Sequence, residues 1–142
     1  MSPAERRPST LLTSSRERST GRHLEASAAG RAAEDAVAAW LVARDFAIVA
    51  TNLRVGHYEL DVVARSGALI VVVEVRTRGA RAWTTGFGSL DAGKRRRIRL
   101  AGERLWQRRY RSDPSAERLR FDAASVTFVD GNPVVEYVPA AF

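Results

Sequence analysis

The sequence contains no cysteine, which excludes disulfide bonds, zinc–thiolate centres and cysteine nucleophiles. Its only histidines are His23 and His57, so we do not expect a zinc site built mainly on histidine. No unbroken apolar run, Ala68 to Val73 included, is long enough to cross a bilayer. The arginines near the N-terminus precede no apolar stretch of the kind that a secretory signal carries. We therefore expect a cytoplasmic protein without a membrane partner.

Lysine is almost absent as well, since Lys94 is the only lysine among 23 basic residues. The net charge is nevertheless +7, and the isoelectric point is about 11.1. Such a charge favours an anionic partner, of which nucleic acid, here most simply DNA, is the commonest. The composition, 45% hydrophobic and 27% charged, is that of a globular protein, and 142 residues fit one domain.

The hydrophobic pattern divides the chain into two parts. Residues 1–26 are rich in serine, threonine and arginine without a sustained apolar period, which predicts a flexible basic tail. Residues 27–142 form the predicted domain, with helices and strands at 28–44, 46–50, 58–65, 68–76, 89–110, 119–129 and 133–138. The resulting α-β-β-β-α-β-β order predicts an α/β fold in which helices flank a mixed central sheet.

The second and third predicted strands form a hairpin that gathers acidic residues. With a turn centred on residues 66–67, Glu59 lies opposite Glu74, and Asp61 lies opposite Val72. One face of the hairpin then carries a polar set and the other an apolar set suited to a core: His57, Glu59, Asp61, Glu74 and Arg76 against Leu60, Val62, Val73 and Val75.

Three neighbouring carboxylates repel one another, so protonation, a basic partner or a bound cation must compensate their charge. Oxygen ligands of this kind suit Mg²⁺, which could activate water and neutralise charge at a phosphorus under attack. The alternative is that Glu59 or Glu74 forms an ion pair with Arg76 or Arg54 on a solvated face. Glu74 directly follows the apolar run 69–73, where an acid is costly, and this position favours a functional role.

Short motifs along the chain follow the order seen in a known family. They are Ala33-Glu34, Asn52-Leu53-Arg54, Tyr58-Glu59-Leu60-Asp61, Val73-Glu74-Val75-Arg76-Thr77-Arg78, Lys94 and Arg120-Phe121-Asp122. From about residue 30 to residue 142 the sequence resembles the YraN family of uncharacterised, endonuclease-like bacterial proteins. That family carries a version of the PD-(D/E)xK nuclease motif.

The resemblance implies a restriction-endonuclease-like fold with an α-β-β-β-α-β core. It also implies that Asp61 and Glu74 are catalytic residues that bind Mg²⁺ or Mn²⁺. The Val75 carbonyl and Glu34 are implied as further metal ligands, and Glu59 as a supporting acid.

Two positions depart from the family pattern. Tyr58 stands where the family usually has glycine, and Arg76 replaces the motif lysine. Arginine can orient a phosphate, but it stays protonated and cannot accept a proton. If the family's lysine acts electrostatically, Arg76 is a sufficient replacement for it. If that lysine transfers protons, Arg76 cannot replace it, and we expect catalytic activity to be severely reduced.

The second predicted helix is strongly basic. Between Asp91 and Arg111 there are nine basic and two acidic residues. Such density of one sign favours binding of a nucleic-acid backbone, although charge on an outer helix face can also be merely solvating. The candidate nucleic-acid-binding residues are Lys94, Arg95, Arg96, Arg97, Arg99 and Arg108.

The main hypothesis is thus a metal-dependent endonuclease-like protein that acts on DNA or structured nucleic acid. One alternative is a nucleic-acid-binding module with the same fold and a catalytically weak or inactive site. Another is a basic protein that contacts only a partner protein.

Overall fold

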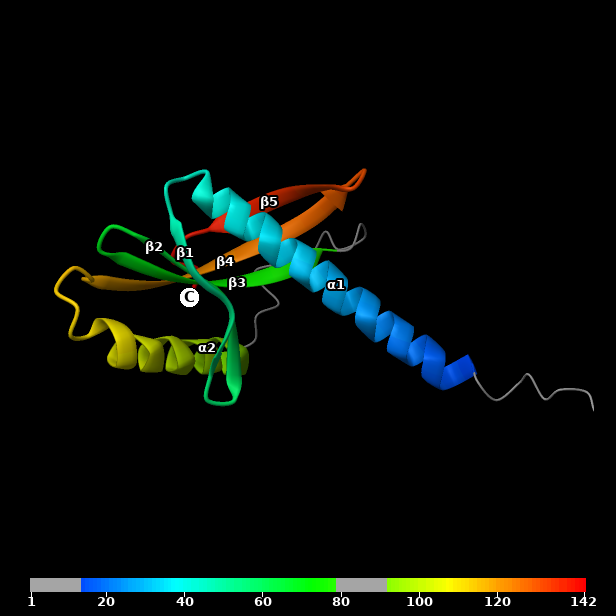
Figure 1. Cartoon of the computed structure of the whole chain (residues 1–142), viewed down its shortest axis with the longest axis horizontal. Coiled ribbons are helices and arrows are strands. Elements are labelled where there is room, and N and C mark those ends of the chain that lie inside the picture. Colours follow the sequence, from blue (N-terminus) through cyan, green and yellow to red (C-terminus); the bar gives the residue numbers. More distant parts are fainter. Residues whose placement is uncertain (1–13, 79–91) are drawn as a thin grey trace, which may run out of the picture.

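The elements follow the order α-β-β-β-α-β-β along the chain (Figure 1). The computed structural model describes the backbone of residues 14–78 and 92–142, and the side chains of residues 28–78 and 92–142. The elements are α1 (Ser14–Val42), β1 (Ala47–Val55), β2 (Tyr58–Ser66), β3 (Leu69–Arg78), α2 (Ala92–Leu105), a π-helical turn (Trp106–Tyr110), β4 (Arg118–Val129) and β5 (Asn132–Val138).

The described strands form one mixed sheet in the order β1-β2-β3-β4-β5. The pairs β1–β2, β2–β3 and β4–β5 are antiparallel, whereas β3 and β4 are parallel. Helix α2 lies in the connection between the two parallel strands, as parallel pairing requires a long crossover. The α/β fold class and the α-β-β-β-α-β core order predicted from the sequence are confirmed.

The two helices cover opposite faces of the sheet (Figure 1). Helix α1 packs the stripe Ala33, Val37 and Leu41, which recurs every fourth residue, against one face. Helix α2 packs Ile98 and its apolar neighbours against the other face. Strand β3 lies in the centre, with Ile70 to Val73 almost fully buried between the two layers, which explains its unbroken apolar sequence.

Helix α1 begins earlier than predicted. Its backbone is helical from Ser14 rather than from Ala28, so residues 14–26 are helical where the sequence predicted an irregular tail. Extending an existing helix is easier than nucleating one, and this allows a segment without an apolar period to continue it. Residues 1–13 lie outside the described residues, and the division into a tail and a domain stays a prediction.

Strand β1 also differs from its prediction. It does not end before Thr51 but continues to Val55, with a register shift between Ile48 and Ala50. The strand continues past Asn52, whose φ is 50°, a value that asparagine tolerates better than most residues.

Helix α2 begins at Ala92, and the predicted start at Ser89 lies outside the described residues. The last five residues of the predicted helix, Trp106–Tyr110, form the π-helical turn. No helix in the described part of the chain is long and apolar enough to cross a membrane.

A buried acid fastens the C-terminal segment to the sheet. Asp122 on β4 is fully buried and accepts two hydrogen bonds from Arg120, at 2.8 and 2.9 Å. It also accepts bonds from the Tyr137 hydroxyl and, at 2.8 Å, from the Ala140 N–H. These donors satisfy its charge, so the family motif at residues 120–122 has a structural role here.

The contact between α2 and β4 depends on a glycine. A Cβ atom at Gly102 would lie 2.5 Å from Cε1 of Phe121, closer than real side chains approach one another. We expect Gly102→Ala to lower the free energy of unfolding by about 2 kcal/mol, because the core must shift to admit the methyl group. Urea denaturation measures this change.

Gly30→Ala is the matched control, since no atom lies within 4 Å of a Cβ at Gly30 in helix α1. This substitution should raise stability by up to about 1 kcal/mol through helix propensity alone. Equal effects of the two substitutions would contradict the packing account.

Candidate functional site

The β2–β3 ladder stops beside Asp61. The last paired residues are Val62 and Val73, and beyond them the Asp61 carboxylate accepts a hydrogen bond of 2.9 Å from the Val75 N–H. A side chain thus replaces the backbone acceptor that a continuing strand would supply. This bond holds the carboxylate of Asp61, a residue of β2, against strand β3, next to Glu74.

The hairpin register is not the predicted one. Ser66 pairs with Leu69, so the turn lies at Gly67 and Ala68 rather than at residues 66–67. Gly67 has a φ of 58°, which glycine adopts without strain. This shift overturns the predicted pairing, in which Glu59 faced Glu74, and it makes Asp61 the close neighbour of Glu74.

Strict alternation of side chains also fails at Asp61. Leu60 packs in the core layer beneath α2, whereas Val62 packs in the layer beneath α1. The prediction that both residues share one core face is therefore wrong. The change of face falls at Asp61, where the pairing of β2 with β3 ends while its pairing with β1 continues. The predicted polar face is divided in the same way between the two sides of the sheet.

Burial and mutual contact determine the electrostatics of the Asp61–Glu74 pair. Glu74 is only 5% exposed, and the two carboxyl groups are in hydrogen-bonding contact. Burial, followed by the charge of Glu74, raises the pKa of Asp61 to about 8. The hydrogen bond from the Val75 N–H opposes this shift. Without a divalent cation, the Asp61 carboxyl therefore retains its proton in most molecules at neutral pH.

Lys94 reaches this pair from helix α2. Its Nζ lies 2.7 Å from Oε1 of Glu74. The sequence assigned Lys94 to nucleic-acid binding, but its side chain contacts the acidic site directly. An ion pair is thus present at Glu74, but the acid is buried, and this partner is Lys94, the only lysine of the chain, which the expected alternative did not name.

Two further acids approach from the α1 side. Asn52 donates a hydrogen bond of 2.8 Å to Glu34 on α1. Burial raises the pKa of Glu34, opposed by the Asn52 bond and reinforced by the charge of Glu59. Glu34 and Glu59 line a hollow of about 360 Å³. Because the charge of Glu34 also acts on Asp61, these acids form a row, defined here as Glu59, Glu34, Asp61 and Glu74.

Arg76 is half-buried on β3, two residues beyond Glu74, and is paired in register with Ser125 of β4. Its charge reaches Tyr58, as does that of Arg97. It is therefore placed close to the acidic pair.

The carboxylate row fits a hard divalent cation in its donor chemistry. Mg²⁺ is commonly held by one or two carboxylates together with waters and substrate phosphate, and Asp61 and Glu74 supply two such groups. Among residues 28–78 and 92–142, no three histidine or acidic side chains converge closely enough to enclose a metal. The pair is thus suited to an open site completed by water and substrate rather than to a closed cage.

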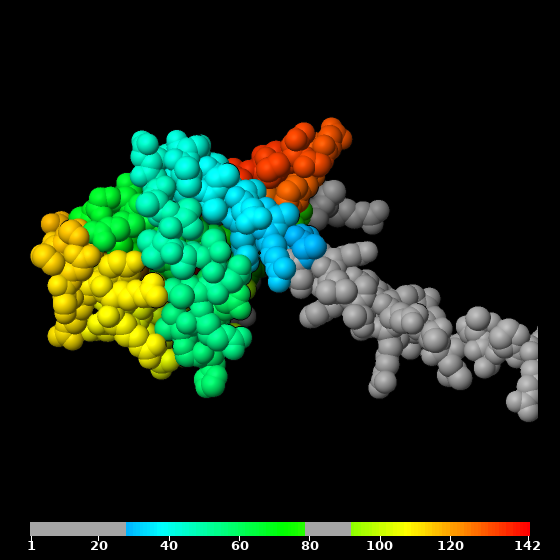
Figure 2. Space-filling view, viewed as in Figure 1, coloured from blue at the N-terminus to red at the C-terminus, as the bar shows by residue number. Residues whose placement is uncertain are grey.

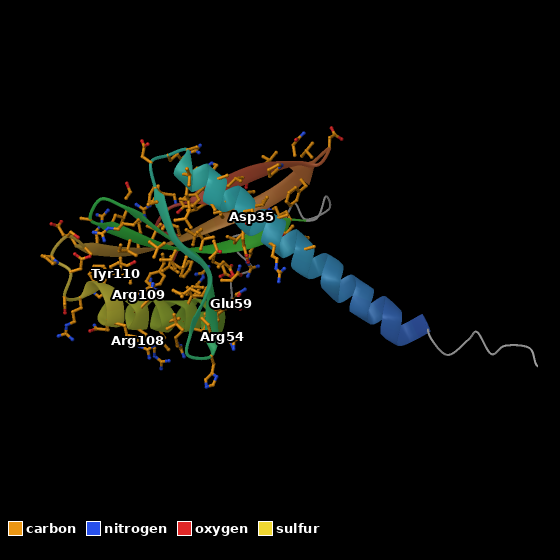
Figure 3. The ribbon with its side chains drawn as sticks, viewed as in Figure 1. Asp35, Arg54, Glu59, Arg108, Arg109 and Tyr110 are labelled. Carbon is orange, nitrogen blue, oxygen red and sulfur yellow. The ribbon has the colours of Figure 1, made fainter. Side chains whose placement is uncertain are left out.

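The basic side chains of α2 lie at varied positions. Arg96, Arg97 and Arg99 are exposed, while Arg95 is half-buried. The Arg99 guanidinium lies 5.8 Å from the centre of the Phe121 ring. Arg108 is exposed on the π-helical turn, at the end of this helical segment away from Glu59 (Figure 3).

Sequence reasoning missed two members of the site. Asn52 was expected to end a strand, yet its side chain holds Glu34. Tyr58 was treated as a departure from the family pattern, yet it lies within electrostatic range of both Asp61 and Glu74. The motifs that contain these residues were the only available signal.

The fold and the site define an α/β protein with an acidic pair at the end of a β-hairpin beside an arginine-rich helix. Residues 33–126 match the model of uncharacterised protein family UPF0102, and the chain belongs to this family. UPF0102 is the family named above as the YraN family, so this match and the relatives confirm the resemblance inferred from the motifs.

A UPF0102 protein of Sorangium cellulosum is 53% identical over 116 residues, which cover 81% of each chain. One of Anaeromyxobacter dehalogenans is 40% identical over 115 residues, covering 81% of this chain and 84% of the relative. One of Pseudomonas paraeruginosa is 36% identical over 115 residues, covering 80% and 90% respectively.

The raised pKa of Asp61 makes stability depend on pH. Between about pH 4 and pH 8 the folded protein holds a proton that the unfolded chain has released, so stability falls as pH rises. Without divalent cations, we expect a slope of up to about 1.4 kcal/mol per pH unit in this range. Urea denaturation in a chelating buffer measures the slope.

Asp61→Asn should flatten this slope, because asparagine keeps an acceptor for the Val75 N–H but does not titrate. Asp130→Asn, at a turn position with a φ of 51° that asparagine accepts, is the control and should leave the slope unchanged. A slope retained in Asp61→Asn would show that another group is responsible.

Proposed function

We propose that this protein is a metal-dependent nuclease that hydrolyses phosphodiester bonds in DNA or structured nucleic acid. The observation that carries the proposal is the Asp61–Glu74 pair, held against the Val75 N–H and contacted by Lys94 from a basic helix. A buried and a half-buried acid next to a dense set of cations suit a site that binds a metal and a phosphate together.

In this proposal Asp61 and Glu74 hold Mg²⁺ or Mn²⁺, with the Val75 carbonyl as a further ligand. Glu34, implied as a ligand by the resemblance, does not converge with the pair and acts on Asp61 through its charge. The bound ion supplies water activation and neutralisation of the charge that develops on phosphate. The Val75 N–H orients the Asp61 carboxylate, and Asn52 orients that of Glu34. Glu59 acts as a supporting acid through its charge, which reaches Glu34.

Lys94 and Arg76 divide the work that the family motif gives to one lysine. Arg76 binds a phosphate oxygen electrostatically, because its guanidinium does not lose its proton. Lys94 contacts Glu74 at 2.7 Å, and its amine, unlike a guanidinium, is suited to proton transfer at the site. The exposed arginines of α2 bind the backbone on either side of the reacting phosphate.

Cleavage of labelled single-stranded, duplex and branched substrates tests this function. We expect Mg²⁺- or Mn²⁺-dependent cleavage by the wild-type protein and a loss of about a hundredfold or more in Asp61→Asn. Lys94→Arg, which keeps the charge but not the exchangeable proton, should slow cleavage by about a hundredfold.

The reverse swap at an exposed position, Arg109→Lys, is the control for Lys94→Arg and should alter cleavage little. An unchanged rate in Lys94→Arg would remove Lys94 from the chemistry. Metal-independent cleavage, or cleavage unaffected by Asp61→Asn, would refute the assigned metal site.

A second candidate function is binding without catalysis. The observation that favours it is the Lys94–Glu74 ion pair, which compensates the buried acid without a metal. This candidate predicts salt-sensitive binding of nucleic acid and no cleavage. Gain of cleavage in Arg76→Lys would then identify Arg76 as the cause of the inactivity.

A further inference from the structure

A hollow of about 350 Å³ lies between the tip of the β1–β2 hairpin and helix α2. Figure 2 shows these two elements side by side on one face of the molecule. Its apolar lining is formed by Val55 and Ala101, which are buried, and by Leu100, which is 49% exposed. Leu100 thus presents apolar surface to the hollow from a helix face that is otherwise charged.

Two rings line the same hollow, those of His57 and Tyr58. Tyr58 is half-buried against the core, so its ring is held in place. Burial, followed by the charges of Glu74 and Asp61, raises the pKa of Tyr58 to about 12, so its hydroxyl remains a hydrogen-bond donor. Because the charges of Glu74 and Asp61 act on Tyr58, which lines the hollow, the hollow lies next to the acidic pair.

The remaining lining residues are cationic. Arg97 and Arg104 project from α2 into the hollow. Gly56, with a φ of 62°, forms the hairpin turn, and Nη1 of Arg104 lies 3.1 Å from the position that a Cβ there would take. The turn thus leaves room for the guanidinium against its backbone. The hollow combines an apolar floor, two rings and two positive charges.

We propose that this hollow binds one unpaired nucleobase, with Arg97 and Arg104 binding the phosphate attached to it. Apolar and aromatic surface accepts the face of a base, whereas bases inside a duplex are stacked and not available to it. The inference rests on the proposed function and extends it, because it assigns the substrate class: nucleic acid that presents an unpaired nucleotide next to the cleavage site.

Binding without catalysis tests this proposal. Affinities are measured for a short single-stranded oligonucleotide containing 2-aminopurine and for the same sequence as a duplex, at low salt in a chelating buffer. We expect the single strand to bind more tightly, with a change in 2-aminopurine fluorescence. Leu100→Gln and Tyr58→Leu should weaken single-strand binding by about tenfold and leave duplex binding unchanged.

Arg109→Gln, which removes a charge from the same helical segment outside the hollow, is the control and should weaken both substrates equally. Because Leu100 is exposed, Leu100→Gln should fold normally, and thermal melting checks both variants. Equal effects of the hollow variants on both substrates, or no effect, would overturn the proposal.

Adenosine 5′-monophosphate is the remaining arm of the experiment. If it binds as tightly as the strand and displaces it, the hollow is a site for free nucleotides, and its assignment to a nucleic-acid strand is overturned. Weak competition by adenosine 5′-monophosphate supports the assignment of the hollow to a nucleic-acid strand. The binding measurements contain no metal and therefore do not depend on cleavage. If the separate cleavage assay failed, the proposed function would be refuted, but a measured preference for single strands would still stand.

Discussion

The site depends on one hydrogen bond, from the Val75 N–H to the Asp61 carboxylate. This carboxylate takes the place of a backbone acceptor, so it is held against the neighbouring strand β3. The β2–β3 ladder ends beside it. The same interruption sends Leu60 and Val62 into different core layers. One interaction therefore brings two acids together and fixes how the hairpin is embedded between the helices.

Electrostatics explain why this arrangement is suited to chemistry. Two buried carboxyl groups cannot both be ionised cheaply, and the raised pKa of Asp61 expresses that cost. Lys94 compensates Glu74 from outside the sheet, at the beginning of a helix that exposes Arg96, Arg97 and Arg99. The fold places the negative pair and the positive helix next to one another, so an anionic substrate bound by the helix would reach the carboxylates directly.

The order of elements and the fold class could be predicted from the sequence because they follow from hydrophobic periods. The apolar run within residues 68–76 predicted a strand, and the hydrophobic period over residues 28–44 predicted the helix that packs Ala33, Val37 and Leu41 against the sheet. Asp61 and Glu74 were selected by pattern and by family motifs, and they do lie together.

The pairing within the hairpin could not be predicted in the same way. Moving the turn by one residue shifts every pair across the hairpin, and no local pattern distinguishes the two turns. The loss of alternation at Asp61 is a tertiary effect, since it arises from a side chain bonding to another strand. The contact of Lys94 with Glu74 likewise joins residues on separate elements, and the composition showed only that this lysine is unique.

Calorimetric titration of Mn²⁺ into the protein without nucleic acid tests the central claim most directly. The account predicts that the wild-type protein binds Mn²⁺ through Asp61 and Glu74, and that Asp61→Asn, which preserves the hydrogen bond from Val75, loses this binding. Equal binding of Mn²⁺ by the wild-type protein and Asp61→Asn, or binding by neither, would contradict it.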